Sequence, residues 1–253
     1  MAMKKVDLNC DMGESFGRYK LGLDQEVIRY ISSANVACGM HAGDPEVMAA
    51  TVALAKEAGV SVGAHPGFAD LQGFGRRNMS LSSAEAYGLV LYQLGALAGF
   101  CRAAGCRLRH VKPHGALYNM AVKDRGLAAA ICMAVRDFDP ELRLLAPAGS
   151  QLQAAAEAMG LGFAGEVFAD RAYMPDGSLV PRSQPGAVIE DEELAVSRVV
   201  RMVCEGKVQA ADGRDIAVKA DSVCVHGDGA KALAFVQRIR QALEAEGVAI
   251  KPF

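Results

Sequence analysis

Short runs of apolar and β-branched residues alternate along the chain with longer segments of amphipathic helical pattern. The short runs predict strands at residues 5–9, 34–38, 60–64, 108–112, 142–146, 163–168 and 222–226. Strict alternation of strands and helices is typical of a parallel sheet with right-handed crossovers. We therefore predict an α/β protein. Because no Pro/Gly/Ser-rich linker divides the chain, residues 1–253 are expected to form one domain.

Several predicted helices begin with clear capping signals. Asp44-Pro45-Glu46 supplies an N-cap, a proline at the first helical position and an acidic first turn. Ser82 and Glu85 have the spacing of a capping box, ahead of an apolar-periodic segment that runs to Arg102. Further helices are expected at residues 190–203 and 229–246.

The pattern within the strands distinguishes an open sheet from a barrel. Strands of an open parallel sheet are buried on both faces and read as continuous apolar runs. The first strand instead alternates Val6, Leu8 and Cys10 with Asp7, Asn9 and Asp11. An apolar face fits an outer layer of helices, and a small or polar face fits a tight barrel interior. We expect a distorted (β/α)7 TIM-like barrel, one unit short of eight, interrupted by a loop-rich stretch at 171–188 and a hairpin around Asp212-Gly213.

Composition narrows the functional classes. The 253 residues are 51% hydrophobic and 22% charged, with a formal net charge of −2. This balance excludes a disordered chain and disfavours nucleic acid or an anionic membrane as a partner. The longest uncharged segment, residues 86–101, is shorter than the ~20 residues that a transmembrane helix needs. Seven cysteines without a Cys-x-x-Cys pair, and an N-terminus without a signal-peptide pattern, indicate a reduced, cytoplasmic enzyme.

Polar side chains gather where the predicted strands end, which is the face on which barrel active sites form. All five histidines of the chain lie in these segments. Several histidines facing carboxylates are typical of a catalytic or binding site. The candidate site residues are Asn9, Asp11, Glu14, His41, His65, Lys112, His114, Glu166, Asp170, Arg171, His226, Gly227 and Asp228.

Lys112 is expected to point into the mouth of the barrel, where a charged amine is costly unless it is paired. Its partner would be an anionic ligand, or a carboxylate such as Asp11 or Glu166. Asp11, His41 and His65 come from three neighbouring strand ends and are candidate ligands of a divalent metal.

The glycine-rich turn His226-Gly227-Asp228-Gly229 opens the last predicted helix. Late barrel loops of this kind commonly hold a phosphate group on a helix N-terminus. The chain has no Gly-x-x-x-x-Gly-Lys-[Ser/Thr] motif, so a nucleotide would not be bound through a P-loop.

Six ordered motifs span the whole chain. They are DLNCDMGE (residues 7–14), SANVACGMHAGD (33–44), GAHP (63–66) with GFGR (73–76), VKPHGALYN (111–119), FADR (168–171) with VPR (180–182), and VHGD (225–228). Together they resemble the lactam-utilisation (LamB/YcsF-type) family, with slight departures such as Met40 where an aromatic residue is usual.

The resemblance implies a (β/α) barrel related to the glycoside hydrolase/deacetylase superfamily. It also implies the A subunit of the bacterial ATP-dependent 5-oxoprolinase. This enzyme converts 5-oxo-L-proline, ATP and water to L-glutamate, ADP and phosphate, and family members are expected to act with two further subunits, B and C.

For that reaction, the general base would be Asp11, His41 or His65. His114 is a candidate for protonating the ring nitrogen as it leaves.

Cations for the phosphoryl group and the substrate carboxylate would come from Lys112, Arg171 and Arg182.

Two other function classes stay open. One is a stand-alone metal-dependent hydrolase of amide or acetylated-sugar substrates, and the other is a non-catalytic scaffold in the complex.

Overall fold

The strands of the protein form a closed parallel barrel. The computed structural model describes residues 4–181, 183–225 and 230–253. Among these residues, seven parallel strands close in the order β1-β2-β3-β4-β5-β6-β9, because β9 pairs with both β6 and β1. The barrel strands are β1 (Lys5–Met12), β2 (Ser33–Ala37), β3 (Ser61–His65), β4 (Leu108–Val111), β5 (Arg143–Ala146), β6 (Gly162–Phe168) and β9 (Ser222–Val225). The predicted (β/α)7 TIM-like barrel is confirmed.

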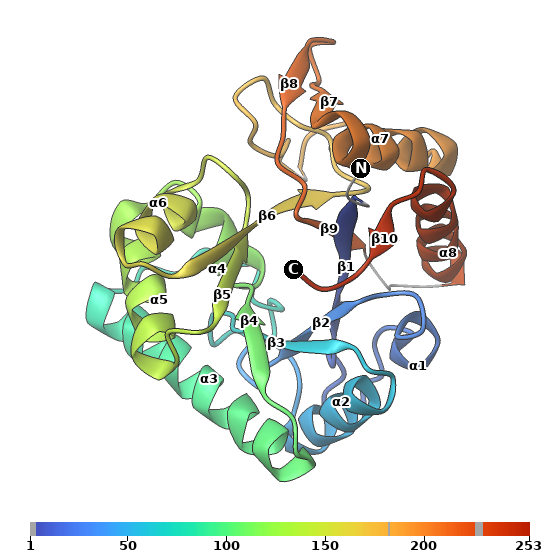
Figure 1. Cartoon of the computed structure of the whole chain (residues 1–253). Coiled ribbons are helices and arrows are strands. Elements are labelled where there is room, and N and C mark those ends of the chain that lie inside the picture. Colours follow the sequence, from blue (N-terminus) through green and yellow to red (C-terminus); the bar gives the residue numbers. More distant parts are fainter. Residues whose placement is uncertain (1–3, 182, 226–229) are drawn as a thin grey trace.

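Helices surround this ring of strands (Figure 1). They are α1 (Asp24–Val27), α2 (Pro45–Glu57), α3 (Ser83–Ala104), α4 (Gly115–Ala121), α5 (Arg125–Phe138), α6 (Gln151–Ala158), α7 (Glu192–Glu205) and α8 (Ala230–Ala245). The capping signals act as predicted. Asp44 Oδ1 accepts hydrogen bonds from the backbone N–H groups at the start of α2, and Ser82 and Glu85 form a reciprocal capping box at the start of α3.

Three local features refine the predicted layout. The strand predicted at residues 5–9 continues to Met12, because Asn9–Met12 pair with β2. The expected hairpin is present as β7 (Lys207–Gln209) and β8 (Asp215–Ala217), whereas the short strand β10 (Ala249–Ile250), which pairs with β1, was not predicted. The last residue of the strand predicted at 222–226 lies outside the described residues.

The barrel interior is a polar network, as the alternation in the first strand predicts. Asp7 accepts hydrogen bonds from the hydroxyl groups of the adjacent Ser32 and Ser33 and of Ser222, which is distant in the sequence. Burial raises the pKa of Asp7 above its usual value, although these hydroxyl groups oppose the rise. The bottom of the barrel is thus filled by hydrogen-bonded side chains rather than by an apolar core.

One layer higher, amide groups continue the network. Asn35 Nδ2 donates to Asn9 Oδ1 (2.7 Å), and Asn35 Oδ1 lies 2.7 Å from His110 Nε2. The ring of Phe253 packs edge-on against His110, with 5.3 Å between the ring centroids, and the chain's end lies at the centre of the barrel (Figure 1). The interior is therefore closed by side chains and does not form a pore.

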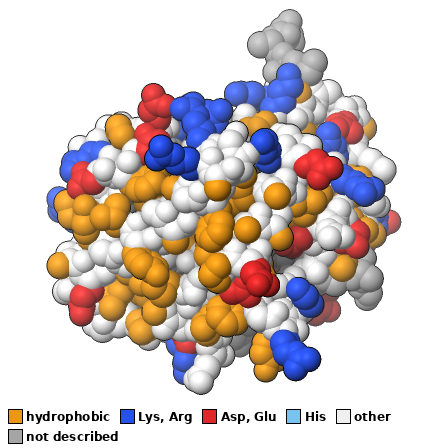
Figure 2. Space-filling view, turned by 90° about the horizontal axis from the view of Figure 1, so that it is seen from below, with side chains coloured by type: hydrophobic (Ala, Val, Ile, Leu, Met, Phe, Trp, Pro, Cys, Tyr) orange, Lys and Arg blue, Asp and Glu red, His pale blue; other side chains and the backbone are white. Residues whose placement is uncertain are grey.

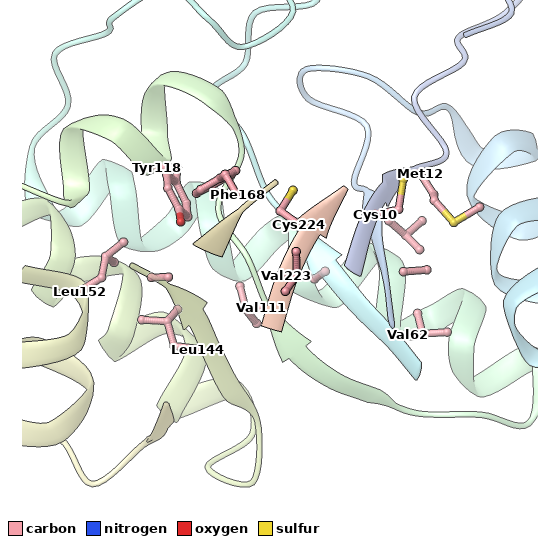
Figure 3. Close-up of a cluster of buried hydrophobic side chains, with 14 of the residues drawn as sticks. Cys10, Met12, Val62, Val111, Tyr118, Leu144, Leu152, Phe168, Val223 and Cys224 are labelled. Atoms are coloured by element: carbon pink, nitrogen blue, oxygen red, sulfur yellow. The ribbon is translucent and has the colours of Figure 1, made fainter. Parts of the chain in front are cut away.

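The outward faces of the strands build the hydrophobic core between sheet and helices. Cys10 and Met12 of β1 are buried there together with Val62, Leu144 and Val223 from other strands (Figure 3). Cys10 thus points to the helix layer, as its position in the alternation predicts.

The longest helix, α3, has an uncharged outer side. No charged residue lies between Glu85 and Arg102, and Tyr92 on this helix is 64% exposed. Figure 2 looks at the side of the molecule that carries α2 and α3, and hydrophobic side chains gather across the middle of that face. Within the described part of the chain, no helix is both long and apolar enough to cross a membrane.

Gly63 of β3 gives a test of the interior packing. A methyl group at this position would overlap the imidazole of His110. We expect Gly63→Ala to lower the free energy of unfolding by about 1–3 kcal/mol, the usual cost of overpacking a core. Gly95→Ala is the matched control: Gly95 lies in α3 with open space around it, so alanine there should stabilise by about 0.5–1 kcal/mol. Urea unfolding measures both, and wild-type stability of Gly63→Ala would contradict this packing.

Candidate active site

A cavity of about 960 Å³ opens where the barrel strands end. Its wall includes seven of the residues that the sequence singled out, namely Asp11, Glu14, His65, Lys112, His114, Glu166 and Arg171. They come from β1, β3, β4 and β6 and from the turns that follow these strands. Residues 176–181 of a later loop also line the cavity.

Lys112 is the centre of the charged part of the site. Its side chain is 3% exposed. Nζ donates to Asp11 Oδ1 (3.0 Å) and forms an ion pair with Glu166 Oε1 (2.8 Å). Nζ also lies 3.2 Å from Asn9 Oδ1 and 3.1 Å from Cys224 Sγ. The ammonium group therefore pairs with both of the carboxylates that the sequence offered as partners.

These contacts keep the amine charged. Burial alone would lower the pKa of Lys112, but the facing groups of Asp11, Cys224 and Glu166 hold it well above its ordinary value. The second oxygen of Glu166 is occupied as well, because Tyr118 Oη donates to Glu166 Oε2 (2.6 Å). A fixed positive charge thus lies at the floor of the cavity.

Beside this charge, three histidines and Glu14 form a compact cluster. One donor atom from each of Glu14, His41, His65 and His114 can be chosen so that all lie within 4.8 Å of one another. His114 Nδ1 lies 2.9 Å from His65 Nε2, and Glu14 Oε1 lies 3.8 Å from His41 Nε2 and 3.7 Å from His114 Nδ1. The rings of His41 and His114 stack with 3.7 Å between their centroids.

The hydrogen-bond partners of two rings determine which nitrogen carries the proton. His65 Nδ1 faces the carbonyl oxygen of Lys112 (2.7 Å), and His114 Nε2 faces the carbonyl oxygen of Phe74 (2.8 Å). A carbonyl oxygen only accepts, so each of these nitrogens is the N–H donor. In the neutral rings the lone pairs of His65 Nε2 and His114 Nδ1 therefore point at each other.

Burial favours the neutral ring in two of these histidines, His41 and His114. It lowers the pKa of His41 well below its ordinary value, and the neighbouring His114 and His65 add to the effect. Burial, followed by the neighbouring His65, likewise lowers the pKa of His114 to about 3. At neutral pH the ring of His114 is therefore neutral, and its role as the acid that protonates the leaving ring nitrogen stays a prediction.

The loop at residues 73–76 covers the cluster. Phe74 has a φ of +54°, in the left-handed region that non-glycine residues rarely adopt, and its carbonyl group is aimed at His114. The Phe74 ring packs edge-on against His41 and His114, at centroid distances of 5.7 Å and 5.2 Å. The guanidinium group of Arg76 lies over the Phe74 ring, 5.1 Å from its centroid, and Arg76 also lines the cavity.

Comparison with known proteins agrees with the geometry. The chain matches the LamB/YcsF family over residues 6–253. It is 63% identical over 250 residues to a protein from Clostridium beijerinckii that is named as the A subunit of 5-oxoprolinase, and the match covers 99% of this chain and 98% of that protein. The chain belongs to the LamB/YcsF family.

Solved structures support this membership. The crystal structure of a lactam utilization protein from Thermus thermophilus superposes on this LamB/YcsF barrel with a TM-score of 0.94 at 51% identity, covering 98% of this chain and 100% of the other. A GH18 chitinase from Pseudoalteromonas aurantia shares only the fold, with a TM-score of 0.51 at 9% identity, over 95% of this chain and 100% of the chitinase. Both likenesses agree with the predicted (β/α) barrel fold.

The remaining predicted residues of this LamB/YcsF protein lie around or outside the cavity. Asn9 lies below it, in contact with Lys112. Arg171 lines it, but Nε and Nη2 donate to carbonyl groups of the loop that ends at Val188, so part of its function is to hold that loop. The backbone carbonyl of Asp170 accepts a hydrogen bond from the N–H group of Ile189, directly after that loop. Arg182, His226, Gly227 and Asp228 lie outside the described residues.

Three contributors to the site had no role assigned from the sequence: Phe74, Arg76 and Tyr118. Phe74 and Arg76 lie far from any predicted strand end, so a search for polar residues at strand ends does not find them. An aromatic residue between two glycines in a loop is nevertheless a signal for an unusual backbone conformation. Tyr118 lies one turn inside α4, where its pattern is that of an ordinary core residue.

His110, below the site, makes the stability of this LamB/YcsF barrel depend on pH. Burial and the nearby Lys112 lower the pKa of His110 to about 3, whereas an unfolded histidine titrates near about 6.5. The unfolded chain therefore takes up a proton that the folded chain refuses. This contribution to stability is complete above the unfolded pKa and is lost as the pH falls from about 6.5 towards 3.

We expect the free energy of unfolding to fall in that window, with His110 contributing about 1.4 kcal/mol per pH unit. Urea unfolding at several pH values from 7.5 to about 4 measures this slope. His110→Asn removes the titrating group, so its stability should approach that of the wild type as the pH falls. Two parallel curves would show that His110 is not the titrating group.

Proposed function

We propose that this chain is the A subunit of an ATP-dependent 5-oxoprolinase. It would open the lactam of 5-oxo-L-proline to L-glutamate with hydrolysis of ATP to ADP and phosphate, together with subunits B and C. The observation that carries the proposal is the 63% identity, over nearly the full length of both chains, to a protein that bears the name of the 5-oxoprolinase A subunit. All seven cysteines are free thiols, which supports a reducing compartment and hence the cytoplasm.

The chemistry of the substrate explains the need for ATP. A five-membered lactam is an unstrained amide, and its opening by water is unfavourable. Transfer of the γ-phosphoryl group from ATP to the lactam oxygen releases ADP and activates the ring carbon. Water adds to this carbon, and the C–N bond breaks as the nitrogen takes up a proton, which leaves an acyl phosphate. A second water then releases phosphate and leaves L-glutamate. The protein must supply a base for the water and positive charge for the developing oxyanion and the phosphoryl group.

The base is best supplied by Asp11 together with His65. Both line the cavity, and Asp11 Oδ2 lies 3.3 Å from His65 Nε2. His41, the third candidate, is 1% exposed and lies behind them, against Gly67 and Gly75. It therefore does not reach the reacting water.

Lys112 is the cation nearest to this base. Its charge is held in place by Asp11 and Glu166 and needs no rearrangement when negative charge develops on the substrate. The phosphate-binding roles predicted for Arg171 and Arg182 remain part of the proposal.

The substrate carboxylate needs a cation that is not already neutralised, and Arg76 meets this requirement. Its guanidinium group lines the cavity and makes no side-chain hydrogen bond or ion pair with the described residues. Its positive charge reaches the cluster, because it lowers the pKa of both His41 and His114 after larger contributions from burial and neighbouring histidines. Arg76 is placed to bind the carboxylate while the lactam faces Asp11 and Lys112.

Glutamate release from 5-oxoproline with Mg-ATP tests the proposed function. The chain is assayed alone and with its B and C partners, and we expect release only in the complete mixture. Asp11→Asn keeps the shape of the side chain and removes its charge, so turnover should fall by about 100-fold or more. Near-normal turnover of Asp11→Asn would contradict its role.

The runner-up function is a stand-alone metal-dependent hydrolase of amides, and the cluster of three histidines and Glu14 is the observation that favours it. Hydrolysis of an amide by the chain alone, without ATP, would support this reading. Failure of folded A, B and C subunits to release glutamate would overturn the oxoprolinase proposal.

Arg76 yields a separate prediction. Arg76→Ala should raise KM for 5-oxoproline by about 10- to 100-fold with a smaller effect on kcat, because a hydrogen bond to a charged group contributes about 1.5–3 kcal/mol. Turnover of 2-pyrrolidinone, the same lactam without a carboxylate, should be unchanged. Arg102→Ala removes a positive charge from the far end of α3 and should leave KM at the wild-type value. Equal effects of Arg76→Ala on both lactams would exclude carboxylate binding.

A further inference from the structure

We propose that Glu14, His41, His65 and His114 bind one divalent transition-metal ion of the zinc class. The four side chains offer three nitrogen donors and one carboxylate oxygen, all within 4.8 Å of one another. This set differs from the Asp11, His41 and His65 expected from the sequence. The inference goes beyond the proposed function and does not depend on it. Because His65 Nε2 would bind the ion, the base of the proposed function would then be Asp11 alone.

The first argument is the orientation of the lone pairs. His65 Nδ1 and His114 Nε2 donate to backbone carbonyl groups, so their other ring nitrogens face each other at 2.9 Å as two acceptors. Two acceptors at this distance repel unless a positive species lies between them. Metal-binding histidines are commonly fixed in this way, with the second ring nitrogen donating to a carbonyl group.

A single shared proton would satisfy His65 and His114 but would leave His41 unexplained. His41 is 1% exposed, and neither Nδ1 nor Nε2 has a hydrogen-bond partner. A buried ring with two unsatisfied nitrogens is costly, and such groups are rare in native proteins. A metal ion at the centre of the cluster serves His41 as well as the facing pair, which one proton cannot do.

The surroundings of His41 hold it at the cluster. A methyl group on Gly67 or Gly75 would collide with its side chain, so the backbone approaches this ring more closely than any other residue type allows. The Phe74 ring closes a further side. This close packing holds the unsatisfied ring beside the other donors.

The donor set selects the class of metal. Imidazole nitrogen suits zinc and its transition-metal neighbours, whereas Mg²⁺ prefers oxygen ligands and retains several waters. The cluster therefore does not have the donor set that Mg²⁺ prefers. When bound, an ion of this class supplies Lewis-acid activation of a carbonyl group or of water.

Asp11 lies just outside the set. Its Oδ1 is 3.0 Å from Lys112 Nζ and accepts from Asn35 Nδ2 at 2.8 Å, while Oδ2 faces His65. Asp11 therefore connects the charged pair at the floor of the cavity to the cluster.

Metal binding by the purified full-length chain tests the proposal without substrate, ATP or partner subunits. After dialysis against a chelator, the chain is titrated with Zn²⁺ and with Co²⁺ by calorimetry and visible absorption. We expect one ion per chain, a Co²⁺ spectrum with nitrogen ligation, no competition from excess Mg²⁺, and a Tm that rises with metal concentration.

Two variants locate the ion. His41→Asn and Glu14→Gln should each weaken Zn²⁺ binding by at least about 10-fold, the loss seen even for groups that only support a ligand. His110→Asn, which changes a buried histidine outside the cluster, should bind Zn²⁺ as the wild type does. Circular dichroism of each variant establishes that it is folded.

Absence of stoichiometric binding to the wild-type chain would overturn the proposal, and so would binding that His41→Asn and Glu14→Gln leave unchanged. Neither result would affect the oxoprolinase assay, which measures glutamate release. Conversely, a chain that binds Zn²⁺ at this cluster but releases no glutamate in the complete mixture would keep the metal site and remove the proposed function.

Discussion

The buried ammonium group of Lys112 is the constraint on which the rest of the structure depends. A charge inside a barrel is tolerated only when partners surround it, and here Asp11 and Glu166 supply carboxylates from β1 and β6. The ion pairs therefore connect distant parts of the ring of strands. Removing the amine would leave the carboxylate of Glu166, whose side chain is fully buried, beside Tyr118 without its cation. The same group that supplies charge to the cavity thus also stabilises the barrel.

The backbone of Lys112 has a second effect. Its carbonyl oxygen faces His65 Nδ1 and so directs the lone pair of Nε2 towards His114 and Asp11. One residue at the end of β4 thereby holds the charged floor of the cavity and sets the tautomer of the neighbouring histidine. The ion pairs and the histidine cluster are consequently one connected unit, and a displacement of β4 would disturb both.

Much of this arrangement could be predicted from the sequence, but only for residues that lie within the strands. Alternation in the first strand was sufficient to place Asp7 and Asn9 inside the barrel and to send Cys10 outward, and the cost of a buried amine predicted the partners of Lys112. The members of the histidine cluster could not be predicted in this way, because Glu14 and His114 lie beyond the strand ends. Their directions depend on the adjacent Gly13 and Gly115, both with positive φ, and period-2 alternation does not specify such turns. The sequence therefore favoured Asp11 over Glu14 as a ligand.

The loop at Phe74 illustrates why function concentrates where local preferences are violated. A left-handed conformation at a non-glycine residue costs of order 1–3 kcal/mol, and it persists only when surrounding contacts over-determine it. Here the same backbone turn aims the Phe74 carbonyl at His114, packs the ring against His41 and places Arg76 at the cavity. A relaxed loop would release all three contacts together. The strained turn at Phe74 thus connects the buried histidines of the cluster to the exposed Arg76 at the cavity.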